Sequence, residues 1–82
     1  MIKQIQYFQA VVRCKSFTEA AEECFISQSA ISQQVQALER ELGFNLLERK
    51  NRKFSLTPAG EHFYKKSLVL IADYERMCQE AR

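Results

Sequence analysis

The stretch between residues 28 and 42 constrains the fold most strongly, because it combines a narrow apolar stripe with a polar face that carries almost no charge. Its aliphatic side chains fall at positions 31, 35, 38 and 42, a spacing that predicts a helix with one buried side. Gly43 follows directly and is a typical residue to end such a helix. The opposite face carries Ser29, Gln33, Gln36 and Arg40, with Ser32 on its flank. The chain is therefore expected to pack a small core against one side of this helix.

Composition places the chain among small helical domains. Its 82 residues allow one core, and the strong helix formers (Ala, Leu, Glu, Lys, Arg, Gln and Met) account for 46 of them. Only two glycines and one proline are available for turns. The predicted fold class is mainly α.

Spacing and capping signals predict two helices before the central one. The first begins at Ile2 and ends near Lys15. Ser16 is followed by Glu19 at the spacing of a capping box, so a second helix is expected to start there. Thr18 is an alternative cap for this second helix.

The remaining elements are predicted from turn and cap residues. Ser27 or Gln28 is expected to cap the central helix, and Thr57, followed by the only proline, marks the start of a last helix that runs to near the C-terminus. Between these helices, positions 54–56 alternate as a short strand does. Two short strands around a turn at Asn51 would make a small β-hairpin.

The formal net charge of +2 conceals a strong pattern. Residues 24–38 carry no charge, although seven of these fifteen residues are Ser or Gln. Four positive charges then fall within five residues, at Arg49, Lys50, Arg52 and Lys53. One segment is thus neutral and polar, and another is strongly basic.

This pairing of segments is typical of proteins that read DNA. Two helices joined by a tight turn, the second with a neutral polar outer face, suit insertion into the major groove. Gln and Ser side chains can hydrogen-bond to base edges, whereas Lys and Arg contact phosphates regardless of sequence. An ordinary solvated surface is the alternative, but such surfaces usually mix Lys with Glu. We predict a helix-turn-helix with a separate basic segment that binds the DNA backbone.

The last predicted helix carries more apolar surface than one small core can cover. It spans about 23 residues, or about 35 Å. Apolar and small side chains step by four and three along it, from position 63 to position 81. We predict a homodimer through this helix, with an interface formed by Phe63, Leu70, Ile71, Tyr74 and Met77. A long core helix folded back on its own domain is the alternative.

Other chemistries find little support in the sequence. The three cysteines form no Cys-x-x-Cys pair, and His62 is the only histidine, so neither a disulfide framework nor a metal site is expected. No phosphate-binding loop or catalytic constellation is present, so we expect neither an enzyme nor a cofactor. The longest aliphatic run, residues 68–72, is too short to cross a membrane. A cytoplasmic protein with reduced thiols and no membrane partner is expected.

Five motifs together resemble the LysR-type transcriptional regulators. They are SFTEAA at 16–21, SQSAISQQV at 27–35, LERELG at 38–43, LLER at 46–49 and LTPAG at 56–60. The resemblance covers nearly the whole chain. It implies a winged helix-turn-helix over residues 1–58, with the helix-turn-helix at about 18–37 and the wing at about 46–57. Residues 58–82 would form the linker helix through which two chains dimerise.

The resemblance also implies roles for individual residues. The start of the third helix meets the bases in this family, which implicates Gln28, Ser29, Ser32 and Gln33, and Gln36 joins them from its place on the polar face. The residues expected near phosphates are Thr18, Ser27, Arg49, Lys50, Arg52 and Lys53. Gln33 stands where many members have Arg, so an adenine or water-mediated contact is expected there. Lys15 replaces a frequent Gly.

The expected partner is double-stranded DNA that contains an interrupted inverted repeat. Family members continue into an effector-binding domain, so the chain resembles the DNA-binding domain of a longer regulator. A small-molecule effector is expected only in that further domain, and a tetramer is an open alternative for the full-length protein. A protein-interaction module that uses the last helix without touching DNA is the second functional hypothesis, and a small enzyme is a distant third.

Overall fold

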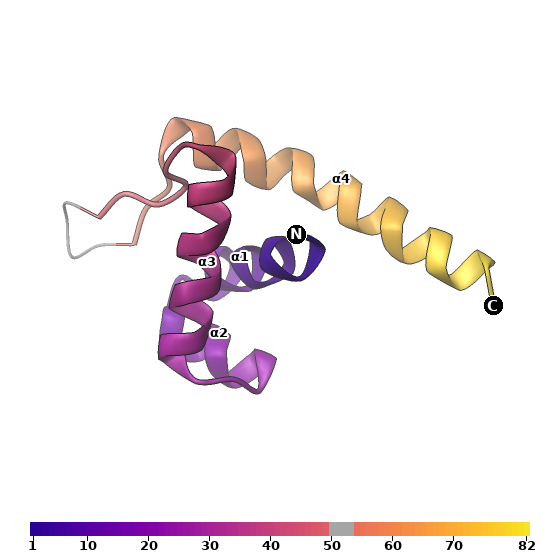
Figure 1. Ribbon diagram of the computed structural model, residues 1–82, viewed down its shortest axis with the longest axis horizontal. Coiled ribbons are helices and arrows are strands. Elements are labelled where there is room, and N and C mark those ends of the chain that lie inside the picture. Colours follow the sequence, from indigo (N-terminus) through magenta and orange to yellow (C-terminus); the bar gives the residue numbers. More distant parts are fainter. Residues whose placement is uncertain (50–53) are drawn as a thin grey trace.

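The computed structural model describes residues 1–49 and 54–82, which fold into a mainly α domain (Figure 1). Four helices follow one another along the described chain: α1 (Ile2–Cys14), α2 (Phe17–Cys24), α3 (Gln28–Leu42) and α4 (Pro58–Glu80). The first three pack against one another, and α4 contacts α1. The predicted order of helices and the mainly α fold class are confirmed.

Side-chain caps start three of the helices. The Ser16 hydroxyl accepts a hydrogen bond from the Glu19 N–H (3.1 Å), and the Ser27 hydroxyl accepts one from the Ala30 N–H (3.1 Å). Thr57 caps α4 in the same way. Each hydroxyl satisfies an N–H group that has no acceptor within its helix. Ser16, and not the alternative Thr18, is thus the cap of α2, and Ser27, and not Gln28, is the cap of α3.

Two helices end at residues that adopt a left-handed conformation without being glycine. Lys15 ends α1 with φ 53°, and Phe25 ends α2 with φ 59°. Gly43 ends α3 with φ 85°, as its position after the apolar stripe predicted. The left-handed conformation of Lys15 explains why a glycine suits this position, because a side chain there costs conformational energy.

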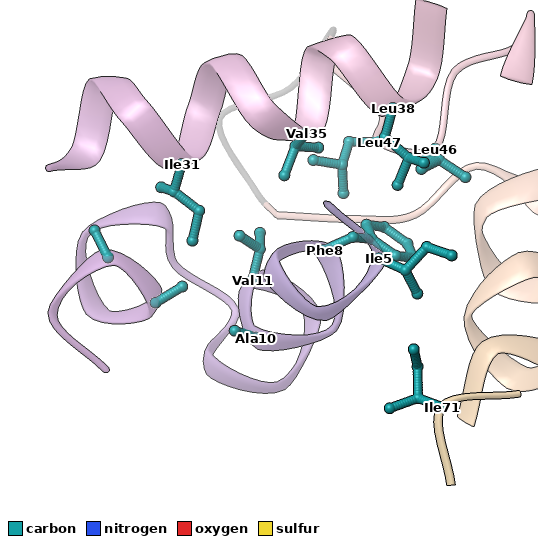
Figure 2. Packing of buried hydrophobic residues seen from close by; sticks show 12 residues of the cluster. Ile5, Phe8, Ala10, Val11, Ile31, Val35, Leu38, Leu46, Leu47 and Ile71 are labelled. Carbon is teal, nitrogen blue, oxygen red and sulfur yellow. The ribbon is translucent and has the colours of Figure 1, made fainter. Parts of the chain in front are cut away.

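The core is formed by α1, the inner stripe of α3 and the segment that follows α3 (Figure 2). Phe8 and Val11 of α1 are fully buried against Ile31, Val35 and Leu38 of α3, while Leu42 is only half-buried. Leu46 is fully buried as well, and Leu47 nearly so. The apolar stripe predicted from the sequence is therefore the inner surface of α3.

The hairpin predicted between α3 and α4 lies only partly within the described residues. Its described residues form one antiparallel bridge, Leu47 with Leu56, flanked by a hydrogen bond from the Glu48 N–H to the Ser55 carbonyl (3.0 Å). The backbone N–H groups of Leu46 and Leu47 donate to the Glu39 carboxylate (2.7 and 3.2 Å) and not to a neighbouring strand. Because the Leu46 N–H donates to Glu39, it does not extend the ladder to Thr57. The turn expected at Asn51 lies outside the described residues.

Helix α4 packs on the core with its first half and extends beyond the other helices with its second half (Figure 1). The rings of Phe63 and Tyr64 meet Phe8 edge-on, with centroids 5.9 and 6.2 Å away. Deeper along the helix, the buried Ser67 hydroxyl accepts a hydrogen bond from the Gln9 amide (3.0 Å). The alternative of a core helix folded back on its own domain is therefore correct only for the first half of α4.

The first turn of α4 lies against the backbone of the preceding segment at Gly60. A Cβ added to Gly60 would lie 2.0 Å from the Leu46 carbonyl oxygen. The same oxygen accepts a hydrogen bond from the Thr57 N–H (3.1 Å). Only glycine allows this approach, so Gly60 sets the position from which α4 departs.

We expect the substitution Gly60→Ala to destabilise the domain by about 3 kcal/mol, because the clash involves a backbone atom and no change of rotamer can relieve it. Urea unfolding followed by circular dichroism measures this change. Ala59→Ser, at the exposed neighbouring position, is the control and should change the free energy of unfolding by less than about 0.5 kcal/mol. A Gly60→Ala variant as stable as the control would contradict the tight contact.

Candidate nucleic-acid interface

The second and third helices form a helix-turn-helix whose outer face is the polar side of α3. Residues 25–27 connect α2 to α3. The side chains expected to read bases lie on this face: Gln28, Ser29, Gln33 and Gln36 are exposed, and Ser32 is half-buried. The apolar stripe of α3 is covered by α1 and α2, so the polar face is the side available to a ligand.

Hydrogen bonds at the start of α3 organise the first of these side chains. The Thr18 hydroxyl donates to the Gln28 side-chain oxygen (3.0 Å), which links α2 to α3. One lone pair of the Gln28 oxygen is thereby used, while its NH₂ group keeps two donors for acceptors on a ligand. The Ser27 and Ser29 hydroxyls lie 3.2 Å apart and share a further hydrogen bond.

The same hydrogen bonds engage the hydroxyls of Thr18 and Ser27, the two hydroxyls expected near phosphates. Thr18 is exposed, and its hydroxyl proton is directed to Gln28. Ser27 is exposed and accepts the capping hydrogen bond of α3. In this arrangement, Thr18 orients Gln28 and does not offer a donor of its own.

One glutamine of the uncharged segment faces away from the polar surface. The Gln34 side-chain oxygen accepts a hydrogen bond from the Gln4 amide of α1 (3.3 Å). Gln34 is half-buried, whereas the adjacent Gln33 is exposed. The two neighbours thus have different surroundings, with Gln34 bonded to α1 and Gln33 open to solvent.

A buried carboxylate links α3 to the basic segment. The Glu39 side chain is 7% exposed, and its oxygens accept hydrogen bonds from the Leu46 and Leu47 N–H groups and from the Arg49 guanidinium (2.7 Å). Sequence reasoning did not assign a role to Glu39, because its partners follow it by seven to ten residues in a segment without helical periodicity. Arg49 remains 43% exposed.

The other three cations of the basic cluster lie outside the described residues. They are Lys50, Arg52 and Lys53. Arg49 is therefore the one member whose surroundings the structure gives.

The predicted interface on α4 falls into two groups. Leu70, Tyr74 and Met77 are exposed, whereas Phe63 is half-buried against the rings of α1. Ile71 is 6% exposed and belongs to the core, so its side chain has little surface left for a second chain (Figure 2). A heptad seam drawn from the sequence alone does not reveal which of its flanks the domain itself covers.

Two titratable groups have displaced pKa values. A hydrogen bond with the Cys78 side chain raises the pKa of Tyr74 above its ordinary value. Partial burial, reinforced by the nearby Glu23 carboxylate, raises the pKa of Cys14. Both groups therefore remain protonated at neutral pH, and all three cysteines are free thiols.

The described part of the chain offers no group of three or more His, Cys, Asp or Glu side chains suited to hold a metal ion. Within the same residues, every helix is too short or too polar to span a membrane.

Comparison with known proteins identifies the family. Residues 2–61 match the family described as bacterial regulatory helix-turn-helix protein, lysR family. This chain belongs to the LysR family. The regulator BenM of Acinetobacter baylyi is 42% identical over 76 residues, which are 93% of this chain and 25% of BenM. BudR of Raoultella terrigena is 45% identical over 71 residues, which are 87% of this chain and 24% of BudR.

The solved structures agree with this assignment to the LysR family. The DNA-binding domain of BenM in complex with catB site 1 DNA has a TM-score of 0.92 and 40% identity, over 96% of this chain and 85% of that one. Its complex with benA site 1 DNA has a TM-score of 0.93 and 40% identity, over 99% of this chain and 91% of that one. The chain spans about a quarter of the length of the curated LysR-family relatives described above.

Removal of the Glu39 carboxylate tests its role in this LysR-family domain. We expect Glu39→Ala to lower the free energy of unfolding by about 3 kcal/mol, because two backbone N–H groups next to buried leucines lose their acceptor. Thermal and urea denaturation measure this loss. Glu41→Ala removes an equal charge from an exposed position of α3 and should cost less than about 0.5 kcal/mol. Equal effects of the two substitutions would show that Glu39 contributes only its charge.

Proposed function

We propose that this chain is a dimeric, sequence-specific DNA-binding domain of a LysR-type transcriptional regulator. The observation that carries the proposal is the exposed and uncharged polar face of α3, which lies at the second helix of a helix-turn-helix. A neutral face of amides and hydroxyls suits base edges better than phosphates. Membership of the LysR family and the likeness to a domain bound to DNA support the same function.

In this proposal α3 enters the major groove of an interrupted inverted repeat. Ser29, Ser32, Gln33 and Gln36 read base edges, and Gln28 joins them with the NH₂ group that Thr18 leaves available. Gln33 contacts adenine directly or through water, since an amide can pair with the N6 and N7 edge of that base.

The affinity for DNA comes mainly from the basic segment. Arg49, Lys50, Arg52 and Lys53 place four positive charges within five residues, and each phosphate contact releases counterions from the DNA. Ser27 is a further phosphate contact, since its hydroxyl is exposed beside the N-terminus of α3. These contacts position the domain without reading sequence.

Two chains pair through α4 in this proposal. The second half of the helix extends beyond its own domain, and it exposes Leu70, Tyr74 and Met77 on one face. A twofold pairing of α4 would cover this apolar surface and would match the symmetry of an inverted repeat.

The complete regulator would contain more than this domain. Because the chain spans about a quarter of its curated relatives, we assign the small-molecule effector and any tetramer to the full-length protein. A bacterial-type regulator of this kind would act in the cytoplasm, where the three free cysteines would stay reduced.

Base reading is tested with Gln33→Ala. We expect this variant to lose discrimination at one base pair per half-site by about 1–3 kcal/mol, because it lacks the amide that pairs with the base. Selection of bound sequences from a random duplex pool gives the operator, and titration of single-base variants then measures the preference.

The adjacent Gln34→Ala is the matched control, since its amide is bonded to α1, and it should keep the base preferences of the unmodified chain. Arg52→Ala should weaken all duplexes alike. If Gln33→Ala kept every preference, the assignment of this face would fail. If the unmodified chain dimerised without any salt-dependent affinity for duplex DNA, the interaction-module hypothesis would replace the proposal.

Dimerisation is tested with Leu70→Asp. Each copy would lose about 1.5 kcal/mol of apolar burial, so the dimer dissociation constant should rise by about 100-fold or more. Sedimentation equilibrium measures this constant. Ala72→Asp adds the same charge at an exposed position about 200° around the helix and should leave the constant unchanged. Equal dissociation of both variants would contradict an interface centred on Leu70.

A further inference from the structure

A polar pocket opens between the second half of α3 and the segment that follows it. Its volume is about 460 Å³, and it is lined mainly by Gln36, Glu39, Arg40, Phe44, Asn45 and Arg49. Gln36 also belongs to the outer face of α3 that the proposed function assigns to base reading. The pocket is therefore continuous with the proposed DNA-binding surface.

The chemistry of the lining suits an anion. Two arginines and two side-chain amides supply N–H donors, and the only carboxylate is that of Glu39. Both Glu39 oxygens already accept hydrogen bonds, from the Leu46 and Leu47 N–H groups and from Arg49. The carboxylate is thus engaged by its own fold, and the pocket keeps an excess of donors and of positive charge.

Arg40 is the positively charged side chain of this pocket that is most available to bind an anion. It is exposed, and no carboxylate of the described residues lies within 4 Å of its guanidinium. Arg49 differs, since Glu39 holds one of its terminal nitrogens at 2.7 Å and leaves other N–H groups of the guanidinium to a ligand. A guanidinium fork matches the oxygens of a phosphate group in two parallel hydrogen bonds.

The position of Arg40 along α3 fits the width of the DNA groove. Arg40 lies on the face that carries Gln33 and Gln36. It is the first charged residue on this face after the fifteen uncharged residues 24–38. Seven residues separate Gln33 from Arg40, which corresponds to about 10 Å of helix. The major groove is about 12 Å wide. A helix that reads bases with Gln33 would thus carry Arg40 to the phosphates that border the groove.

We infer that this pocket binds a backbone phosphate of duplex DNA. Arg40 and the Asn45 amide contact the phosphate oxygens together with Arg49, and Glu39 is a positioning residue that orients the Arg49 guanidinium. The inference rests on the proposed function and extends it, because it adds Arg40 and Asn45 to the DNA-binding residues.

The first test is the salt dependence of DNA binding by Arg40→Ala. Fluorescence anisotropy is measured between 50 and 200 mM KCl, with the duplex recovered by selection and with an unrelated duplex of equal length. The slope of log K against log salt should fall by about 0.9 for each protomer that loses the contact, or about 1.8 for a dimer. The decrease should be equal for both duplexes, since a phosphate contact carries no sequence information.

Arg76→Ala is the matched control. It removes an exposed arginine of α4 that is paired with Asp73, far along the chain from the pocket, and it should leave the slope unchanged. An unchanged slope for Arg40→Ala, with normal binding by the unmodified chain, overturns the pocket assignment alone. Absence of salt-dependent binding by the unmodified chain instead overturns the proposed function.

The second test separates DNA phosphate from a free anion. Side-chain NMR signals of Gln36, Arg40 and Asn45 are followed during addition of duplex DNA, and separately of inorganic phosphate at constant ionic strength. We expect the DNA to shift all three signals, and Arg40→Ala to abolish the shift at Asn45. Shifts with inorganic phosphate but none with DNA would overturn the assignment in favour of a free-anion site.

Discussion

The buried Glu39 carboxylate joins the helix proposed to read DNA to the segment proposed to hold it. One oxygen receives the N–H groups of Leu46 and Leu47, and the other receives the Arg49 guanidinium. The two leucines enter the core directly after α3 because their backbone donors have an acceptor there, which a buried N–H group requires. The same carboxylate therefore orders the chain and places the first residue of the basic cluster beside α3.

Features that depend on neighbours in sequence could be predicted from the sequence. The inner stripe of α3, its cap at Ser27 and its end at Gly43 follow from helical periodicity and from the hydrogen-bonding needs of helix ends. The start of α4 at Thr57 follows for the same reason. The polar face of α3 was also predictable, because it is the face that the stripe leaves outside.

Features that depend on distant partners could not be predicted in this way. Two hydrogen bonds join different helices: one links Gln4 to Gln34, and the other links Thr18 to Gln28. The sequence does not state how these helices are arranged relative to one another. Ile71 looked like an interface residue since it flanks an apolar seam, but the packing of α4 on α1 decides which flank is covered. The bond from the Leu46 N–H to Glu39, which keeps this donor out of the ladder beside Leu47, likewise joins groups seven residues apart.

The close contact between Gly60 and the Leu46 carbonyl has a mechanical consequence. The first turn of α4 rests directly on the Leu46 carbonyl, while the N–H group of the same residue is held by Glu39. Compression at such a contact cannot be absorbed by a side chain, so a displacement of the start of α4 would shift the chain around Leu46 with it. A torque applied to the far end of α4 would consequently reach the Glu39–Arg49 pair through the backbone itself.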